Sequence, residues 1–277
     1  QKCLDGIKKT NYDNCEIIIV ENNSCKDTFS FYHRIAPEEE MVHGVQTFQG
    51  KLSHNIDIKV VVWENEFNYS KLNNFGVQFA TGKYYIFLNN DVEMIGTDWI
   101  LRLSGDCHRN KVGVAGVKLY YPDDTVQHAG IVIGIGGSKR GIAANMFQGL
   151  PREEHGYQNR ASLQADYSAV TAACMMVKKD VFDAVDGFTE KLQVAFNDVD
   201  FCLKVQKKGY LVMYDPKIEG YHYESKSRGA ENTPEKVRRF QGEIDTFRVF
   251  WKDILKDGDP YYNRNFSLVS NQYLLGK

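Results

Sequence analysis

The sequence YYIFLNNDVE, at residues 84–93, decides the fold class of this chain. Its first five residues form an apolar run that is typical of a buried strand, and Asn89-Asn90-Asp91 closes that strand. Ligands of open α/β sheets bind beyond the carboxyl ends of the strands. A carboxylate at Asp91 is therefore well placed to hold a divalent cation between the protein and a diphosphate. The alternative is that Asp91 only shapes a turn, because Asp and Asn both favour such positions.

Outward from this strand, strands and helices alternate along the first 117 residues. We expect strands at 15–20, 59–63, 84–88 and 112–117, and helices at 1–10, 69–80 and 99–108. This alternation favours an α/β fold in which a mixed, mostly parallel central sheet is flanked by helices. Glu21 directly follows the strand at 15–20, so it is expected at a strand end, as Asp91 is.

The second half of the chain has fewer clear periods. Residues 118–165 form a long excursion with an expected hairpin around 131–135. Later elements are expected as strands at 169–177 and 211–214 and helices at 181–185 and 199–208. A last helix begins at Thr233-Pro234, since Thr caps helices well and Pro suits the first helical position. Its apolar residues recur every three or four positions, so it should dock on its own domain. They are Val237, Phe240, Ile244, Phe247, Trp251 and Ile254.

Composition excludes several classes of protein. The 277 residues contain 34 Lys and Arg and 36 Asp and Glu, so the net charge of −2 predicts no general attraction to nucleic acid. No apolar run is long enough for a transmembrane helix and no Cys pair has C-x-x-C spacing, which favours an intracellular, cytoplasmic protein. The dinucleotide, phosphate-loop, H-E-x-x-H and G-x-S-x-G motifs are absent, which weakens oxidoreductase, ATPase, metalloprotease and esterase hypotheses.

Two later segments carry candidate chemistry. In FNDVDF, residues 196–201, Asp198 and Asp200 open the expected helix, either as a general base and its neighbour or as simple capping residues. In YHYES, residues 221–225, His222 is either a packed core histidine or a metal ligand. Arg228 follows closely and could contact a phosphate.

Taken together, these segments resemble the inverting glycosyltransferases of family 2, which have the GT-A fold, and especially the bacterial polysaccharide and rhamnosyltransferase-like branch. The resemblance covers about residues 1–230 and rests on the order and spacing of several stretches. They are EIIIVENNSCKD (16–27), FNYSKLNNFGVQFATG (67–82), YYIFLNNDVE (84–93), 112–137, 173–188, FNDVDFCLKVQKKG (196–209) and 221–229. It implies a catalytic domain at 1–230 and a C-terminal helical extension at 231–277 that packs on it.

The resemblance also implies roles for individual residues. Asp91 and His222 would bind the metal, and Asp198 would be the catalytic base, with Asp200 beside it. Donor sugar and acceptor would approach Asp166, Thr171 and Ala172. The nucleotide and its diphosphate would contact Glu21, Asn22, Asn74, Asn90 and Arg228. The expected cofactor is Mg²⁺ or Mn²⁺, because a diphosphate leaving group needs its charge neutralised.

The implied reaction moves a sugar from a UDP- or dTDP-sugar to a hydroxyl of a glycan or lipid-linked glycan, with inversion. Oligomers and peripheral association with the inner face of the membrane are compatible with it, and nucleic acid is not an expected partner. Two departures stand out: Asn89 replaces the first acid of the D-x-D metal motif, and the family's first central strand, of the type V-S-I-I-I-P, is missing. They favour an alternative, a catalytically degenerate domain that only binds a nucleotide sugar or glycan. A nucleotidyltransferase is a third possibility, although its Gly-rich loop and signature Lys are not visible.

Overall fold

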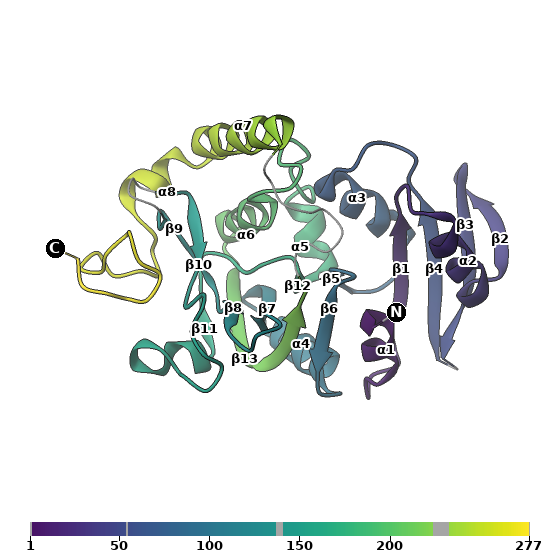
Figure 1. Ribbon diagram of the computed structural model, residues 1–277, viewed down its shortest axis with the longest axis horizontal. Helices are drawn as coiled ribbons and strands as arrows, with labels where there is room; N and C mark the ends of the chain where they lie inside the picture. Colours follow the sequence, from purple (N-terminus) through teal and green to yellow (C-terminus); the bar gives the residue numbers. More distant parts are fainter. Residues whose placement is uncertain (1, 54, 137–140, 224–232, 277) are drawn as a thin grey trace.

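The computed structural model describes residues 2–53, 55–136, 141–223 and 233–276. Of the two main β-sheets, the larger lies near the middle of the molecule and the smaller at the right side of Figure 1, and helices lie against them and along the upper side. The smaller sheet has four strands in the order β1-β4-β3-β2. They are β1 (Glu16–Glu21), β4 (Ile56–Val62), β3 (Val45–Ser53) and β2 (Glu38–Val42). The β2–β3 hairpin was not expected from the sequence.

The larger sheet has seven strands, five of them in the order β11-β13-β7-β12-β5. They are β11 (Ala165–Asp166), β13 (Leu211–His222), β7 (Val112–Tyr120), β12 (Cys174–Lys178) and β5 (Tyr84–Leu88). Two further strands, β6 (Val92–Ile95) and β8 (Val126–His128), pair with β13 and β7 respectively. The expected hairpin in the long excursion is present as β9 (Ile131–Ile133) and β10 (Ala143–Asn145).

The sheets are mixed, as expected, but the prediction that they are mostly parallel was wrong. Among the described strands, only the pairs β1–β4 and β13–β7 are parallel. The alternation on which the prediction depended ends at residue 117. Strand β12 comes from the second half of the chain and inserts antiparallel between β5 and β7, so it reverses the direction at the centre of the larger sheet.

Helices cover both faces of the larger sheet. Helix α4 packs in one apolar cluster with the residues of β7 and β12 that face it, while α5 and α6 pack in the cluster on the other face. The helices that matter for this arrangement are α3 (Tyr69–Gly76), α4 (Trp99–His108), α5 (Lys179–Ala184) and α6 (Asn197–Lys207). Helix α1 (Lys2–Lys8) lies beside β6, and α2 (Lys26–Ile35) lies against β3. Short 3₁₀ helices cover Val77–Phe79 and Tyr157–Ser162.

Strands β1 and β5 are the end strands of their two sheets. The four β-branched residues of β1 are half-buried. None of the described strands has the V-S-I-I-I-P pattern, so the central strand that the resemblance implies does not join the two sheets within this chain.

The chain ends with α7 (Pro234–Phe250), α8 (Lys252–Asp257) and a coil that carries the C-terminus to the left side of Figure 1. The Thr233 side chain accepts a hydrogen bond from the Lys236 N–H, as its N-cap position predicts. Phe247 and Trp251 are buried in the same cluster as α6, whereas Val237 and Phe240 are 53 % and 42 % exposed. The apolar stripe of the helix therefore docks along its second half.

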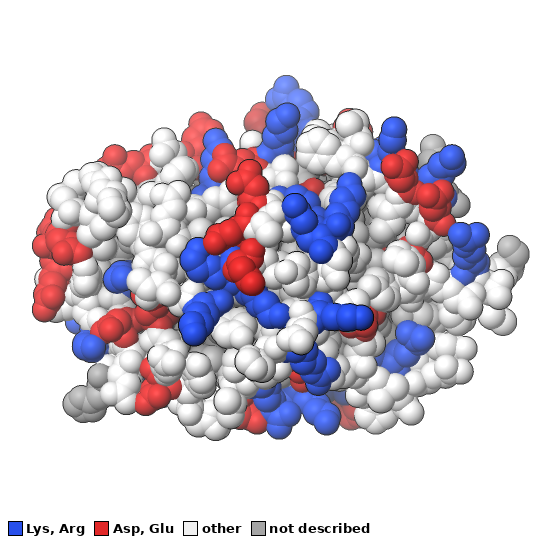
Figure 2. Space-filling view, turned by 180° about the vertical axis from the view of Figure 1, so that it is seen from behind, with Lys and Arg blue, Asp and Glu red and all other residues white. Residues whose placement is uncertain are grey.

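In the part of the chain that the structure describes, no helix is long and apolar enough to cross a bilayer. Charges of both signs share the surface. Figure 2 shows Lys and Arg side chains grouped near the middle of one face, beside a strip of Asp and Glu. The net charge of −2 is thus a balance of opposed local charges and not a sparsely charged surface.

Candidate active site

The turn after β5 meets the end of β13, and this meeting brings Asp91 and His222 together. The Asp91 Oδ1 atom lies 3.2 Å from His222 Nε2. The backbone of Asp91 is held as well, because its carbonyl accepts a hydrogen bond of 3.0 Å from the Tyr223 N–H. Antiparallel pairing of β6 with the last residues of β13 sets this register, with Val92 opposite His222. Two residues 131 positions apart therefore lie side by side, and they are the two residues that the resemblance assigns to the metal.

The donor set at this point fits a hard divalent cation. Neighbouring ligands in an octahedral Mg²⁺ or Mn²⁺ site lie about 3 Å apart, and the Asp91–His222 separation of 3.2 Å matches that spacing. Asn89, which replaces an acid, places its Nδ2 atom 3.3 Å from His222 Nε2. Within the described residues, no three His, Cys, Asp or Glu side chains gather at a metal site. A cation held by Asp91 and His222 would thus take its other ligands from phosphate oxygens and water.

Asp198 lies at the start of α6, where the helix dipole favours a negative charge. Its Oδ2 accepts a hydrogen bond of 3.3 Å from the Ala172 N–H, and its Oδ1 accepts one of 2.8 Å from the Val199 N–H. Burial raises the pKa of the Asp198 carboxyl above its ordinary value, while these bonds and the Thr171 side chain lower it. The result is a rigid carboxyl that can exchange a proton, which is what a general base needs.

The residue before this helix start has an unusual backbone. Phe196 adopts the left-handed conformation, with φ of 61°, which is rare for a bulky residue and costs about 1–3 kcal/mol. Its ring packs against two rings of α7, with centroids 5.8 Å from Phe240 and 5.6 Å from Phe247. Helix α7 therefore holds Phe196 in its strained conformation, and Phe196 directly precedes the first turn of α6, which carries Asp198.

The segment at residues 171–173 connects Asp198 to the Asp91 turn. On one side, Ala172 and Thr171 contact the Asp198 carboxyl, as described above. On the other side, the Ala173 carbonyl accepts a hydrogen bond of 2.8 Å from the Asn89 N–H. The Tyr69 hydroxyl donates to the Ala172 carbonyl at 2.9 Å and fixes the segment from α3. Thr171 and Ala172 thus lie next to the candidate base, where the resemblance placed the donor and acceptor.

Asp200 was expected beside the base as a second catalytic residue, and the structure gives it another role. Its side chain is almost fully buried, and both oxygens are bound within the fold. Oδ1 accepts from Trp251 Nε1 at 2.8 Å, and Oδ2 accepts from the Thr189 hydroxyl at 2.6 Å. Asp200 therefore joins α6 to the C-terminal helices, because residues two positions apart on a helix, such as Asp198 and Asp200, point to nearly opposite sides.

The expected nucleotide contacts at the end of β1 are engaged in shaping a turn. Glu21 is buried, and its two oxygens accept hydrogen bonds from the Ser24 N–H at 2.6 Å and the Ser24 hydroxyl at 2.8 Å. Asn22 donates to the carbonyl oxygens of Trp63 and Asn65, at 3.1 and 2.8 Å. In this structure both side chains fix the loops after β1 and β4, and Glu21 does not face open space.

Asn74 was also expected on the nucleotide side, and its amide instead binds the loop after α5. It donates to the Phe188 carbonyl at 2.9 Å and accepts from the Phe188 N–H at 2.8 Å. Both polar atoms of the side chain therefore bind backbone, and this prediction of a direct nucleotide contact is corrected.

Three further predictions have different outcomes. Asp166 lies on β11 opposite Met213, near the start of β13, whereas the candidate site lies at the other end of that strand. Burial raises the pKa of Asp166 and the nearby Arg109 lowers it. The charged group that acts on Asp166 is therefore Arg109, which is not one of the predicted site residues. Asn90 is exposed in the turn that carries Asp91. Arg228 lies outside the described residues.

Sequence reasoning missed Tyr69 and Gln127, both of which contact the site. Gln127 lies in β8, within the long excursion at 118–165, where no strand was expected before the hairpin. Part of this could have been inferred from the sequence. If the short apolar stretch that contains Gln127 and His128 is buried, both polar side chains need hydrogen-bond partners within the protein. His128 and Trp251 are both buried, so neither side chain is exposed to an acceptor.

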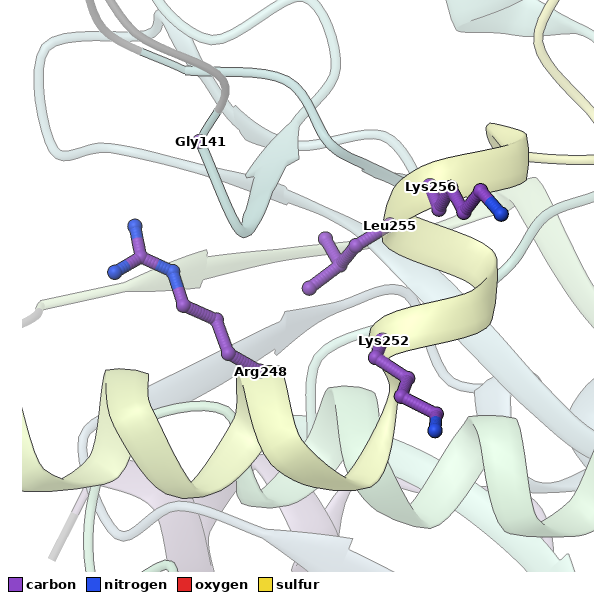
Figure 3. A pocket seen from close by; sticks show the side chains of 5 residues that line it. All are labelled: Gly141, Arg248, Lys252, Leu255 and Lys256. Atoms are coloured by element: carbon purple, nitrogen blue, oxygen red, sulfur yellow. The ribbon is translucent and has the colours of Figure 1, made fainter.

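A separate hollow of about 290 Å³ lies between α7, α8 and Gly141. Figure 3 shows Arg248 and Leu255 directed toward the hollow, while Lys252 and Lys256 extend away from it. Its cations do not converge on one point, and none of the predicted site residues lines it. The candidate active site is therefore the Asp91–His222–Asp198 region.

Comparisons with known proteins identify the family of the chain. Residues 1–185 match the family described as "Glycosyl transferase family 2". An uncharacterized protein, y4gI, of Sinorhizobium fredii is 41 % identical over 96 % of this chain, and the O-antigen biosynthesis protein RfbC of Myxococcus xanthus is 30 % identical over 95 %. The chain spans only 27 % and 19 % of the lengths of these two relatives.

Solved structures share the fold at low identity. A mannosyltransferase of Pyrobaculum calidifontis in complex with GDP-Man and Mn²⁺ matches 91 % of this chain and 59 % of its own, with a TM-score of 0.58 and 15 % identity. GalNAc-T7 with UDP, GalNAc and Mn²⁺ matches 89 % of this chain and 49 % of its own, with a TM-score of 0.58 and 11 % identity. These likenesses show the GT-A fold. The chain belongs to glycosyl transferase family 2.

Proposed function

We propose that this chain transfers a sugar from a nucleotide-diphosphate sugar to a hydroxyl of a glycan acceptor, with inversion at the anomeric carbon. Asp198 would accept the proton of the attacking hydroxyl. Asp91 and His222 would hold Mg²⁺ or Mn²⁺, which would supply charge neutralisation for the diphosphate leaving group. The hydroxyl oxygen would approach the sugar from the face opposite the diphosphate, and this single displacement inverts the configuration.

One observation carries the proposal: a candidate base and a candidate metal site are joined through one short segment. Asp198 contacts Thr171 and Ala172, and the next residue, Ala173, binds the turn that carries Asp91. A positioned base and electrostatic stabilisation of the leaving group are the two contributions that such a transfer needs. Their connection through rigid backbone hydrogen bonds would keep both in fixed relation to one substrate.

The comparisons support the chemical class of the donor. The solved neighbours hold UDP with Mn²⁺ and GDP-Man with Mn²⁺, so a nucleoside diphosphate and a divalent cation are the first ligands to test. The O-antigen biosynthesis relative supports a polysaccharide precursor as the acceptor. A UDP- or dTDP-sugar remains our proposal for the donor, and the type of sugar, including hexosyl and rhamnosyl, is open to the same screen.

The decisive variant is Asp198→Asn, which keeps the size and shape of the side chain but cannot accept the proton. A thermal-shift screen of nucleoside diphosphates and their sugars, with and without Mn²⁺, first identifies the donor, since a ligand that binds only the folded state raises the midpoint. Release of nucleoside diphosphate is then measured. We expect Asp198→Asn to lose turnover by about 10²–10⁴-fold while it keeps the thermal shift with the donor.

Asp183→Asn provides the matched control, because Asp183 is an exposed carboxylate of α5 that pairs with Lys179 at 2.7 Å. Its turnover should equal that of the wild type. If Asp198→Asn kept turnover within about threefold, the assignment of the base would be wrong. Metal-dependent nucleotide binding by the wild type without any sugar release or transfer would instead favour the degenerate binding domain, for which the replacement of an acid by Asn89 is the supporting observation.

A further inference from the structure

Strand β8 carries two buried polar residues in succession, Gln127 and His128, which are 5 % and 1 % exposed. The proposed mechanism uses neither. Neighbouring side chains of a strand point to opposite faces, so the two residues serve different surroundings. His128 Nδ1 lies 2.6 Å from Asn145 Oδ1, and its Nε2 accepts from the Thr171 N–H at 3.4 Å. Gln127 faces the other way, toward His222.

Gln127 makes two hydrogen bonds to the same residue. Its Oε1 atom lies 2.7 Å from His222 Nδ1, and its Nε2 donates to the His222 backbone carbonyl at 3.4 Å. A carbonyl oxygen cannot donate, so the side-chain nitrogen of Gln127 must face the His222 carbonyl and its oxygen must face the ring. Nδ1 of His222 therefore carries the proton in the neutral ring.

This arrangement determines what the other ring nitrogen can do. With the proton on Nδ1, Nε2 of His222 keeps its lone pair, and it is this atom that lies 3.2 Å from Asp91 Oδ1. A neutral imidazole whose other nitrogen donates to a fixed acceptor is the usual form of a metal-ligating His. The same bond also fixes the plane of the ring, because Gln127 is itself held by its second bond to the backbone.

We propose that Gln127 is a positioning residue of the metal site, which sets the tautomer and orientation of His222 so that Nε2 is available to the cation. The inference rests on the proposed function for the identity of the site. It adds Gln127, from strand β8, which was not expected from the sequence. Gln127 acts through His222, so it is not itself expected to touch substrate.

The test measures binding of Mn²⁺ alone to the full chain, by electron paramagnetic resonance of the free ion. Gln127→Met keeps the length of the side chain but removes the acceptor, and we expect its Mn²⁺ affinity to fall by about 10–100-fold. Gln127→Glu keeps an acceptor for Nδ1–H, so its affinity should stay within about threefold of the wild type. His128→Leu is the matched control: it perturbs the same strand from the other face and should bind Mn²⁺ as the wild type does.

Two results would overturn the proposal. One is wild-type Mn²⁺ affinity in Gln127→Met, and the other is an equal loss in Gln127→Met and His128→Leu, which would show only that β8 must be intact. Should Gln127→Met fail to fold, nitrogen-15 NMR of the wild-type His222 ring decides: a proton on Nδ1 supports the proposal, and a proton on Nε2 overturns it. Absence of Mn²⁺ binding by the wild type would refute the proposed metal site, whereas the NMR result on the His222 ring tests the bond to Gln127 without any metal.

Discussion

Replacement of Asp106 by Asn should stabilise this protein at neutral pH. Asp106 on α4 and Asp215 on β13 are 7 % and 5 % exposed, and among the described residues the second carboxyl oxygen of Asp106, Oδ2, is buried without a hydrogen-bond partner. Gln164 Nε2 donates to Asp106 Oδ1 at 3.1 Å, and Arg109 lies 3.6 Å from the same oxygen. Burial and the neighbouring Asp215 together raise the pKa of Asp106 to about 6. The protein therefore retains a proton on this pair well above the ordinary range of Asp.

The sign and size of the effect follow from that pKa. Because the folded pKa of Asp106 is above the ordinary 3.8, the stability that its protonated form contributes is complete below about pH 4. This stability is lost as the pH rises through about 6, and the loss above that pH amounts to about 3 kcal/mol. Asn cannot ionise, and its amide can still accept from Gln164 and donate to Asp215. We expect Asp106→Asn to be more stable than the wild type by about 2–3 kcal/mol at pH 8, and equal to it near pH 4.

Urea unfolding followed by circular dichroism, at several pH values from 4 to 8, measures this difference. Asp183→Asn is the control, because an exposed ion pair of this kind should change the free energy of unfolding by less than about 1 kcal/mol at every pH. The reasoning fails if Asp106→Asn is no more stable than the wild type at pH 8. It also fails if the gain is the same at pH 4 and pH 8, since the effect would then not come from ionisation.

Two further predictions concern residues that support the candidate site. Trp251→Phe removes the donor to the buried Asp200 carboxylate and should lower the free energy of unfolding by about 1.5–3 kcal/mol in urea. Trp63→Phe, at an indole that donates to an exposed loop carbonyl, is its control, and equal losses in the two variants would contradict the role of Asp200 as an anchor. Thr171→Val removes a hydroxyl that lowers the pKa of Asp198, so this pKa should rise further. The acid limb of kcat/KM would then move to higher pH, and an unchanged or lower limb would argue against Asp198 as the base.

Local patterns in the sequence predicted most of the elements and the centre of the site. The helix at 99–108 has its expected bounds, and the Thr233 cap and the 131–135 hairpin are present. Asp91 and His222 lie together because Asp91 directly precedes β6, whose first residue pairs with His222 at the end of β13. The resemblance assigned both residues to one metal site, whereas the helix, the cap and the hairpin were expected from local patterns. These features depend on periodicity and capping, which act over a few residues.

What the sequence did not predict depends on contacts between distant residues. Asn74 binds Phe188, 114 residues away, and Trp251 donates to Asp200, 51 residues away. No local pattern distinguishes a polar side chain that will find such a partner from one that will face substrate. The strand directions in the larger sheet were mispredicted for the same reason. Strand β12, which pairs antiparallel with β5, begins 86 residues after β5 ends.

Hydrogen-bonding capacity separates the predicted residues that serve the fold from those that can serve a ligand. A buried polar side chain must have its donors and acceptors bound, and once they bind protein they offer little to a substrate. Both polar atoms of Asn74 and both oxygens of Asp200 bind the chain itself, so their positions in family-like motifs reflect the construction of the site. His222 differs, because Gln127 occupies one ring nitrogen and turns the other toward Asp91, where a cation could join them. A side chain is a stronger candidate for a chemical role when the fold binds one of its polar atoms and directs another polar atom toward a second candidate ligand. This criterion favours the Asp91–His222 pair.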